Sequence, residues 1–485
     1  MTMLDTRTRW LALYVLCLGD LMIVLDGTIV NVALPSIRDD LGFSQTSLAW
    51  VVNAYLLTFG GFLLLGGRLG DLFGHRRLFL SGIALFTAAS LACGVASSQG
   101  FLIAARAVQG LGGAVVSAVA LSLLMMLFTE QGDRAKAMGV FGFVLSGGGV
   151  VGVLAGGILT DLLSWNWIFL VNLPVGVAVF LLTLRLLPAD GEAMATGRVD
   201  FAGAITVTGS LMLAVYAIVN GNEEGWGSAQ TLGLLGAAAV LMAAFLVIES
   251  RIANPLMPLG IFRNRSVSTA NILGGLMAAG LFGYFFLSAL YLQLVLGYSP
   301  LEVGLAYLPG TVLWGASSLL LSDRLVMRFG IRPPLIAGLG LMTVGLLLLA
   351  RTPVDGNWLV DVLPATLAAS LGAGIAFNPI LLAAMSGVGQ EQAGLASGVV
   401  NTAFMMGGAV GLAALAAIAD ARTESLVDSG EGALEALNSG YNLAFLVGAI
   451  FVVASALVAA TLPRGEPVGA HGEEPSGVPA AAEAE

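Results

Sequence analysis

The chain contains 485 residues, of which 58% are hydrophobic and only 10% are charged. An average soluble domain is about 45 to 50% apolar and about 25% charged, so this composition excludes an ordinary soluble globule and indicates an integral membrane protein. The formal net charge of -10 gives no support to a nucleic-acid partner and disfavours a polybasic lipid-binding surface. Two cysteines and two histidines supply almost no metal ligands, so no metal or other cofactor is expected.

Apolar runs long enough to span a bilayer, which takes about 20 residues, recur along the chain. In its first part they predict six helices, near residues 11–34, 47–66, 78–97, 101–128, 135–160 and 166–187. The first run is longer than the apolar core of a signal peptide, about 7 to 15 residues, so we expect it to remain as a spanning helix.

Eight further runs follow a polar stretch. Two lie near 201–219 and 230–248, and the last six lie near 266–296, 300–321, 334–350, 359–386, 393–420 and 439–462. The sequence therefore predicts an all-α membrane protein of fourteen spanning helices. After Pro463 the chain is rich in Gly, Pro, Ala and Glu, which predicts a disordered cytoplasmic tail over residues 464–485.

Basic residues indicate the orientation, because Lys and Arg accumulate in short cytoplasmic loops. With fourteen helices and both termini in the cytoplasm, only Arg38, Arg351 and Arg422 of the twenty Lys and Arg residues fall on outer segments, and Arg106 lies within a helix. One miscounted helix would destroy this asymmetry, so the count supports fourteen.

The fifth and thirteenth predicted helices carry the same glycine pattern. Gly139, Gly148, Gly149, Gly152 and Asp161 recur at identical spacings as Gly398, Gly407, Gly408, Gly411 and Asp420. Such a duplication predicts two pseudo-symmetric six-helix bundles, residues 1–187 and 266–463. Residues 188–265 between them hold the two additional helices, which lack membrane-embedded charge and are expected to pack peripherally.

Four segments carry recognisable motifs: LDGTIVNVALP at 25–35, GRLGDLFGHRR at 67–77, RAVQGLGGA at 106–114 and WIFLVNLP at 167–174. They resemble motifs of the major facilitator superfamily, and the first resembles the signature of its fourteen-helix drug:proton antiporters. The resemblance covers nearly the whole chain before the tail.

This resemblance implies a transporter and not an enzyme. It implies a proton-coupled antiporter that exports lipophilic or cationic small molecules by alternating access, as in multidrug efflux and antibiotic resistance. Its partners would be membrane lipid, protons and a small-molecule substrate, and it would work as a monomer in the bacterial inner membrane. The proton gradient would supply the energy, because no GxxxxGK[ST] nucleotide-binding loop is present.

Three alternatives stay open. A dedicated exporter of one endogenous metabolite, antibiotic or lipid would use the same scaffold. A proton-coupled importer would share the fold but not the first-helix signature. A sensor or membrane enzyme fits less well, because the chain shows neither a soluble signalling domain nor a cluster of His and carboxylates.

Three charged residues lie within the predicted hydrocarbon layer: Asp20, Asp26 and Arg106. Each costs about 2.5 to 3.5 kcal/mol at the bilayer centre on insertion scales, so they should face a cavity or one another. At about 100° per residue, Asp20 and Asp26 point roughly 120° apart and cannot share one narrow face. Asp26 lies in the first-helix motif and is our candidate proton carrier, with Arg106 as its electrostatic partner; a structural ion pair is the alternative. Asp20 either takes part in proton coupling or bonds to a neighbouring helix.

Gating is expected at two places. In the 67–77 loop, Asp71 and Arg76 are expected to bond across the two halves or to helix ends; the alternative is a positive-inside anchor. The second half has Met327 where Asp71 stands, so any latch should be asymmetric. The candidate gating residues of this loop are Gly67, Arg68, Asp71, Gly74, Arg76 and Arg77.

The fifth helix departs from the antiporter pattern GxxxGPxxGG, because Val153 stands where the family has proline. Its small residues permit close helix approach, and we expect them to seal the fifth helix against its counterpart in the second half. The candidate gating residues here are Gly148, Gly152, Gly156 and Gly157.

Aromatic and amide side chains on the central helices are candidates for an amphipathic substrate cavity. For each, packing or interhelical hydrogen bonding is the alternative. They are Asn31, Trp50, Tyr55, Gln109, Asn172, Tyr284, Tyr291, Gln293, Asn378 and Asn401.

Overall fold

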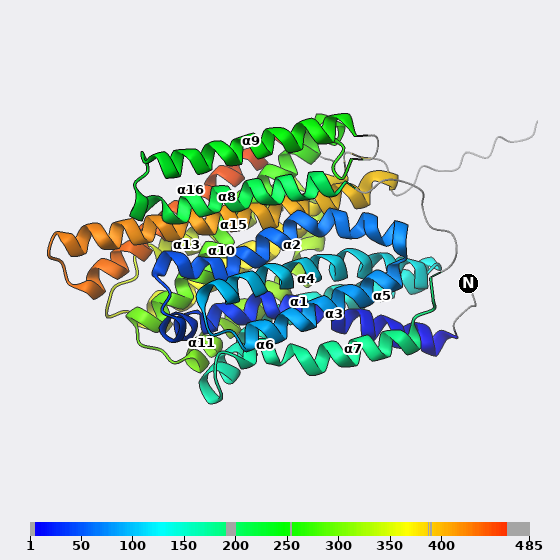
Figure 1. Ribbon diagram of the computed structural model, residues 1–485, viewed down its shortest axis with the longest axis horizontal. Helices are drawn as coiled ribbons and strands as arrows, with labels where there is room; N and C mark the ends of the chain where they lie inside the picture. Colours follow the sequence, from blue (N-terminus) through cyan, green and yellow to red (C-terminus); the bar gives the residue numbers. More distant parts are fainter. Residues whose placement is uncertain (1–4, 191–199, 253–254, 387, 389, 463–485) are drawn as a thin grey trace, which may run out of the picture.

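The protein is a bundle of long helices that run roughly side by side (Figure 1). The computed structural model describes residues 5–190, 200–252, 255–386, 388 and 390–462. Within these residues, fourteen helices are long and apolar enough to cross a membrane, which confirms the predicted all-α fold. The predicted tail and most of the 188–200 linker lie outside the described residues.

The first half supplies six spans and is followed by two additional helices. The six spans are α1 (Thr6–Leu41), α2 (Gln45–Phe73), α3 (His75–Gly94), α4 (Gln99–Leu127), α5 (Gln131–Leu162) and the pair α6 (Trp167–Leu170) and α7 (Asn172–Leu186). The additional helices are α8 (Phe201–Glu224) and α9 (Ala229–Arg251).

The second half also supplies six spans. After the short η1 (Leu259–Arg263) they are α10 (Arg265–Leu290) with η2 (Tyr291–Val295); α11 (Pro300–Ser317) with η3 (Ser318–Ser322) and α12 (Asp323–Phe329); α13 (Arg332–Leu349); η4 (Trp358–Val362) with α14 (Leu363–Met385); α15 (Gln390–Asp428); and α16 (Ala433–Ala459).

Several helices are longer than the apolar runs that predicted them. α1 continues past Arg38 to Leu41, because helical hydrogen bonding extends beyond the hydrocarbon core until a cap ends it. Gly42 supplies that cap with a φ of 70°, and Ser44 begins α2 by accepting a hydrogen bond from the Ser47 N–H.

The sixth span is not the single helix predicted over 166–187. It breaks at Val171, between α6 and α7. Pro174 lies one turn into α7 and has no N–H to donate to the Leu170 carbonyl, so the helical hydrogen-bond ladder is interrupted there.

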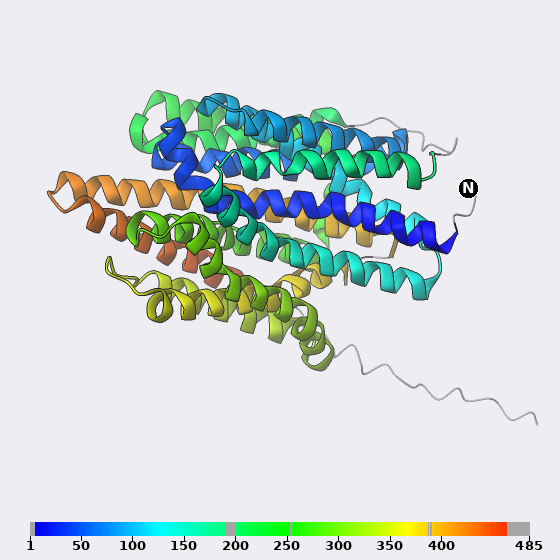
Figure 2. The ribbon, with the colours of Figure 1, turned by 90° about the horizontal axis from the view of Figure 1, so that it is seen from below.

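Glycines bring the fifth helix of each half against the first. A Cβ at Gly152 on α5 would lie 2.1 Å from Thr28 Oγ1 on α1, and a Cβ at Gly411 on α15 would lie 2.2 Å from the Ala279 Cβ on α10. Gly152 and Gly411 are equivalent in the duplicated pattern, so the two halves, which lie beside each other in Figure 2, share this packing.

This packing corrects the helix that the α5 glycines were expected to contact. Gly148, Gly152 and Gly156 contact α1 of their own half, not the equivalent helix of the second half. Only Gly157 faces the second half: a Cβ there would lie 2.7 Å from the Pro300 carbonyl oxygen on α11. Gly148, Gly152 and Gly156 thus let the backbones of α5 and α1 approach closely within the first half, because a glycine has no side chain to hold them apart.

Two helix pairs make most of the contact between the halves: α5 with α11, and α2 with α15. A Cβ at Gly60 on α2 would lie 2.9 Å from the Met405 Cβ on α15. We call the end of the bundle at which α1 begins the near end and the opposite end the far end. Gln293 Nε2 donates to the Val32 carbonyl, 2.8 Å away, beside the α5–α11 contact, so the halves meet at the far end.

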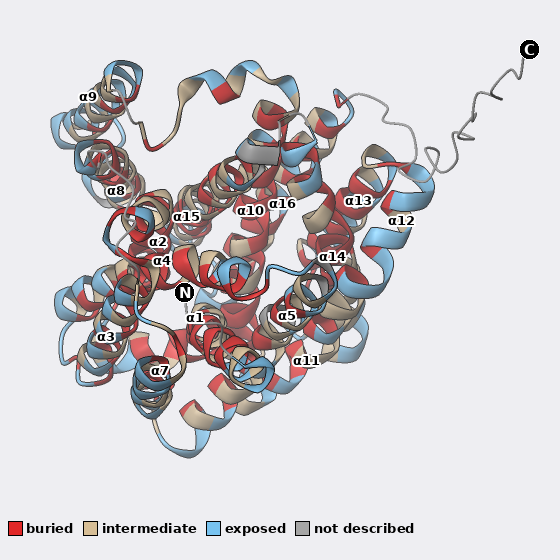
Figure 3. Ribbon diagram, turned by 90° about the vertical axis from the view of Figure 1, so that its right-hand side faces the viewer, coloured by how far each residue is buried: buried red, intermediate tan, exposed pale blue. Residues whose placement is uncertain are grey.

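The additional helices lie at the outside of the bundle, next to this interface (Figure 3). α8 packs against both α2 and α15, whereas α9 lies farther out. Asn222 Nδ2 of α8 donates to the Ala417 carbonyl of α15, 2.7 Å away. A Cβ at Gly61 on α2 would lie 1.9 Å from Thr208 Oγ1 on α8, so α8 approaches α2 closely there. α8 therefore contacts both halves.

Candidate functional site

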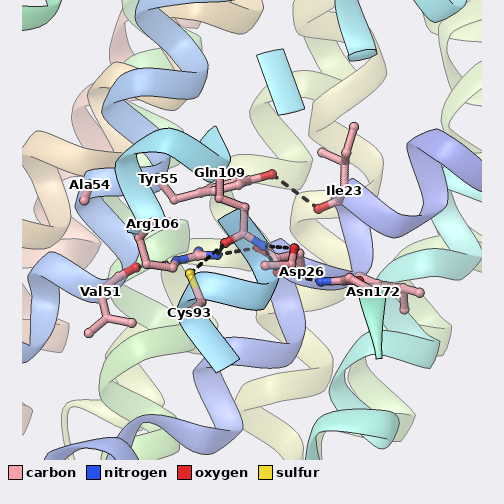
Figure 4. Close-up of polar contacts among 12 residues, drawn as sticks. Ile23, Asp26, Val51, Ala54, Tyr55, Cys93, Arg106, Gln109 and Asn172 are labelled. Carbon is pink, nitrogen blue, oxygen red and sulfur yellow. Dashed lines mark hydrogen bonds and ion pairs between the residues drawn. The ribbon is translucent and has the colours of Figure 1, made fainter. Parts of the chain in front are cut away.

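Asp26 of α1 and Arg106 of α4 form an ion pair in the interior of the first half (Figure 4). Arg106 Nη1 donates to Asp26 Oδ2, and both side chains are fully buried. Two of the three charges that the sequence places in the membrane are thus brought together, although they lie on different helices. Because water does not reach the buried pair, each side chain compensates the charge of the other.

Two amides complete the coordination of Asp26. Gln109 Nε2 donates to Asp26 Oδ1 at 2.6 Å, and Asn172 Nδ2 donates to the same oxygen at 3.1 Å. Gln109 also accepts from Arg106 Nη1 at 2.6 Å and donates to Ser90 Oγ at 2.9 Å. The carboxylate therefore links α1, α4 and α7, and through Ser90 also α3.

Arg106 has further partners on α2 and α6. Its Nε donates to the Val51 carbonyl, 2.9 Å away. Its Cζ lies 4.4 Å from the Tyr55 ring centroid and 5.5 Å from that of Phe169, so both rings stabilise the cation. Among the described residues, its buried Nη2 has no hydrogen-bond partner.

This network ties the protonation of one carboxylate to the packing of several helices. An ionised Asp26 only accepts hydrogen bonds, and both of its oxygens have donors. A protonated Asp26 would carry a hydrogen that needs an acceptor and would no longer attract Arg106. Protonation of Asp26 would therefore rearrange contacts between α1 and α4.

Asp20, the other carboxylate of α1, is also buried but has a different partner. It accepts a hydrogen bond from the Ser117 hydroxyl of α4. Asp20 and Asp26 thus both contact α4, at points about two to three turns apart along that helix. The predicted bond from Asp20 to a neighbouring helix is present.

The predicted 67–77 loop is helical except at Gly74, because it consists of the end of α2 and the start of α3. We keep the name 67–77 loop for this segment, which makes contacts within its own half. Asp71 Oδ2 lies 3.8 Å from Arg68 Nη1, and Asp71 Oδ1 lies 3.4 Å from His75 Nε2; both partners belong to the same segment. Arg76 Nη2 donates to the Leu184 carbonyl at the end of α7, at 2.7 Å. Of the two expected bonding patterns, the structure shows the bond to a helix end, and Asp71 is held by neighbours along the chain.

Sequence reasoning missed Asp190, the residue that fixes this loop. Gly74 adopts a φ of 95°, and the Asp190 carboxylate lies beside it and accepts from the N–H groups of Arg76 and Arg77 at 2.9 and 3.0 Å. The carboxylate thus caps the first turn of α3. No local pattern marks Asp190, because its partners are more than a hundred residues away. Gly67, another candidate gating residue of this segment, makes no close contact of this kind: a Cβ there would have no atom within 4 Å.

Comparison with known proteins identifies the family. Residues 16–412 match the Major Facilitator Superfamily. The chain belongs to this superfamily. It is therefore a multi-pass membrane transporter that acts on small molecules, and not an enzyme.

Three relatives are similar to the chain over most of its length. It is 40% identical over 454 residues to the puromycin resistance protein pur8 of Streptomyces alboniger, covering 92% of this chain and 90% of that protein. It is 37% identical over 461 residues to the cephamycin export protein CmcT of Amycolatopsis lactamdurans, covering 94% and 93%. It is 37% identical over 412 residues to the multidrug resistance protein Stp of Mycobacterium tuberculosis (strain ATCC 25618 / H37Rv), covering 85% and 76%.

A solved structure shows the same fold. A bacterial homolog of the human lysosomal transporter Spinster superimposes with a TM-score of 0.66 at 16% sequence identity, covering 94% of this chain and 97% of that one. At this identity the match concerns the fold of the superfamily alone.

The candidate cavity residues do not form one group in this superfamily member. Tyr55, Gln109 and Asn172 surround the Asp26–Arg106 pair. Tyr284 and Tyr291 are buried in the second half, where Tyr291 OH donates to the Pro353 carbonyl. The others make separate contacts: Asn31 with its own helix, Trp50 with Tyr216 of α8, Gln293 with Val32, and Asn378 with the Ser318 carbonyl, while Asn401 is half-buried on α15.

Proposed function

We propose that the protein is a proton-coupled antiporter that exports lipophilic or cationic small molecules, antibiotics among them, by alternating access. The observation that carries the proposal is the enclosed network around Asp26 and Arg106, because it joins one carboxylate to α1, α4 and α7 and, through Ser90, to α3. The resistance and export proteins similar to this chain support the direction of transport.

The proposed cycle uses Asp26 as the proton carrier. Proton binding from outside the cell weakens the attraction to Arg106, changes the α1–α4 contacts and favours release of substrate. Proton loss to the cytoplasm restores the ion pair and favours binding of the next substrate. The free energy comes from the proton gradient, and no cofactor takes part. Asp20 is a second candidate for proton coupling, since it lies on the same helix and is buried.

Charge in the loops supports an orientation with the near end and both termini in the cytoplasm of the bacterial inner membrane. Arg68, Arg76 and Arg77 lie at the near end, whereas Arg38, Arg351 and Arg422 lie at the far end. Basic residues favour the cytoplasmic side. The protein would work as a monomer surrounded by lipid, and the far-end contact of the two halves would close it toward the outside.

The gating proposal follows from the placements described above. The 67–77 loop, anchored by Asp190 and Leu184, would hold the near end of α2, α3 and α7 as one unit during the cycle. Gly157 against α11 would form part of the outer seal, and Gly148, Gly152 and Gly156 would make α1 and α5 move together.

The breadth of substrates decides between a multidrug exporter and a dedicated one. Two relatives are named for one antibiotic each and one for multidrug resistance, so a drug-susceptibility panel on cells that express the chain is the direct test. We expect resistance to rise against several structurally unrelated lipophilic compounds. Resistance to a single compound would indicate a dedicated exporter, and increased uptake in place of resistance would contradict export.

A further inference from the structure

Asn53 of α2 is fully buried, yet in the part of the chain that the structure describes neither its Nδ2 nor its Oδ1 has a hydrogen-bond partner. Buried amides are normally paired, because an unpaired donor or acceptor loses its bonds to water without replacement. Asn172, by comparison, bonds to Asp26. The unpaired amide of Asn53 therefore raises the free energy of this conformation.

Helix periodicity places Asn53 at the interface between the halves. It lies seven residues, about two turns, before Gly60 and so shares its face of α2. Gly60 packs against Met405 of α15, and a Cβ at Gly398 of α15 would lie 2.9 Å from Leu64 of α2. Residue numbers fall along α15 as they rise along α2, so the two helices run antiparallel.

This register sets Asn53 opposite residues 409–413 of α15. Ala409, Leu412 and Ala413 in that stretch are fully buried and apolar, so their side chains offer the amide no partner. Asn53 also lies in the part of α2 nearer the far end, because α2 begins there at Gln45. Separation of the halves at the far end would bring water to the Asn53 amide.

We propose that Asn53 sets the balance between the two conformations of the transporter. Its unpaired amide disfavours the state in which the far ends touch, and water pairs it in the state in which they separate. Asn53 thus promotes outward opening without contacting substrate or the Asp26–Arg106 pair. The proposal rests on the alternating access proposed above.

The test measures how often the far end opens. Val153→Cys places a thiol on α5, where the side chain is 1% exposed and the backbone packs against Gly304 of α11. A membrane-impermeant maleimide applied to the far side of reconstituted vesicles reaches it only when α5 and α11 separate, so the labelling rate reports the open population. Protein without Val153→Cys gives the background from the buried Cys17 and Cys93.

Asn53→Leu should lower that labelling rate roughly five- to 150-fold, the range expected for relieving one buried unpaired amide. Asn53→Ala should also lower it, which separates loss of the amide from a change in side-chain volume. Asn220→Leu on α8 should leave the rate unchanged, because the Asn220 amide bonds to the Tyr216 carbonyl of its own helix at 2.8 Å.

The outcomes separate this inference from the proposed function. If the Val153→Cys protein with Asn53 intact is labelled, but adding either Asn53 substitution leaves the labelling rate unchanged, the proposed role of Asn53 is wrong and alternating access stands. If the Val153→Cys protein is labelled no faster than protein without this cysteine, while substrate is still transported, the far ends do not separate at α5 and α11. Both proposals are then overturned.

Discussion

Arg106 depends on a partner that lies 80 positions away in the sequence. Its guanidinium is fully buried between Asp26, Gln109, the Val51 carbonyl and the ring of Tyr55. A buried charge with one partner removed is far more costly than the intact pair, by about 3 to 5 kcal/mol. The two residues should therefore behave as a unit, in stability and in transport.

Asp26→Asn is expected to abolish pH-driven export, since it removes the proposed proton carrier. It should also lower thermal stability, because the Arg106 charge loses its counter-ion, and the double variant Asp26→Asn/Arg106→Gln should regain stability but not transport. Proton-driven transport in proteoliposomes and thermal unfolding in detergent measure the two effects.

Asp39→Asn is the matched control on the same helix, because Asp39 is exposed at the far end of α1. It should leave both quantities unchanged. Normal proton-driven transport by Asp26→Asn would show that Asp26 is not the carrier and that the pair is structural.

At the scale of the elements, the α1–α5 contact controls where Asp26 lies. Gly152 leaves no room for a side chain, since a Cβ there would lie 2.1 Å from Thr28 Oγ1 and 3.1 Å from the Leu25 carbonyl oxygen. Leu25 is the residue before Asp26, so a displacement of α1 at this point moves the ion pair. Val153, where the family has proline, leaves the α5 backbone continuous over this contact.

Gly152→Leu is expected to reduce coupled export strongly, because overpacking costs about 1 to 3 kcal/mol and pushes α1 away from α5. Gly149→Leu is the matched control, since no atom lies within 4 Å of the Gly149 Cβ position, and it should transport normally. Substrate and proton fluxes in reconstituted vesicles measure both variants. Equal fluxes in the two variants would mean that the α1–α5 approach does not position the site.

At the scale of the whole molecule, the halves touch mainly through α2 with α15 and α5 with α11, and α8 contacts both α2 and α15 from outside. Through Thr208 it packs on one half, and through Asn222 it bonds to the other. The hairpin of α8 and α9 therefore flanks the interface between the halves and does not enter either bundle (Figure 3).

This placement predicts that substrate does not protect α9. Leu232→Cys and Val240→Cys, at positions 56% and 67% exposed, should react with a lipid-soluble thiol reagent at the same rate with and without substrate. Asn401→Cys on α15, one of the candidate cavity positions from the sequence, should be protected. Protection of both α9 positions would place the hairpin along the transport pathway.

The sequence alone determined the number of spans, the duplication and the charged pair. These features are encoded locally: an apolar run of about 20 residues must be a spanning helix, and a carboxylate such as Asp26 within one must find a partner. The Asp26 motif and the glycine spacings are likewise visible in short segments, so the family and the identity of the central residues could be predicted.

Only the tertiary structure decided which surfaces those residues meet. The pairing of Asp190 with the 67–77 loop, the packing of the α5 glycines on α1 and the unpaired amide of Asn53 all depend on contacts between helices distant in the sequence. In lipid, the hydrophobic effect does not distinguish an apolar helix face that meets lipid from one that meets protein. Close packing and interhelical hydrogen bonds choose the partners, and these arise only when the helices assemble.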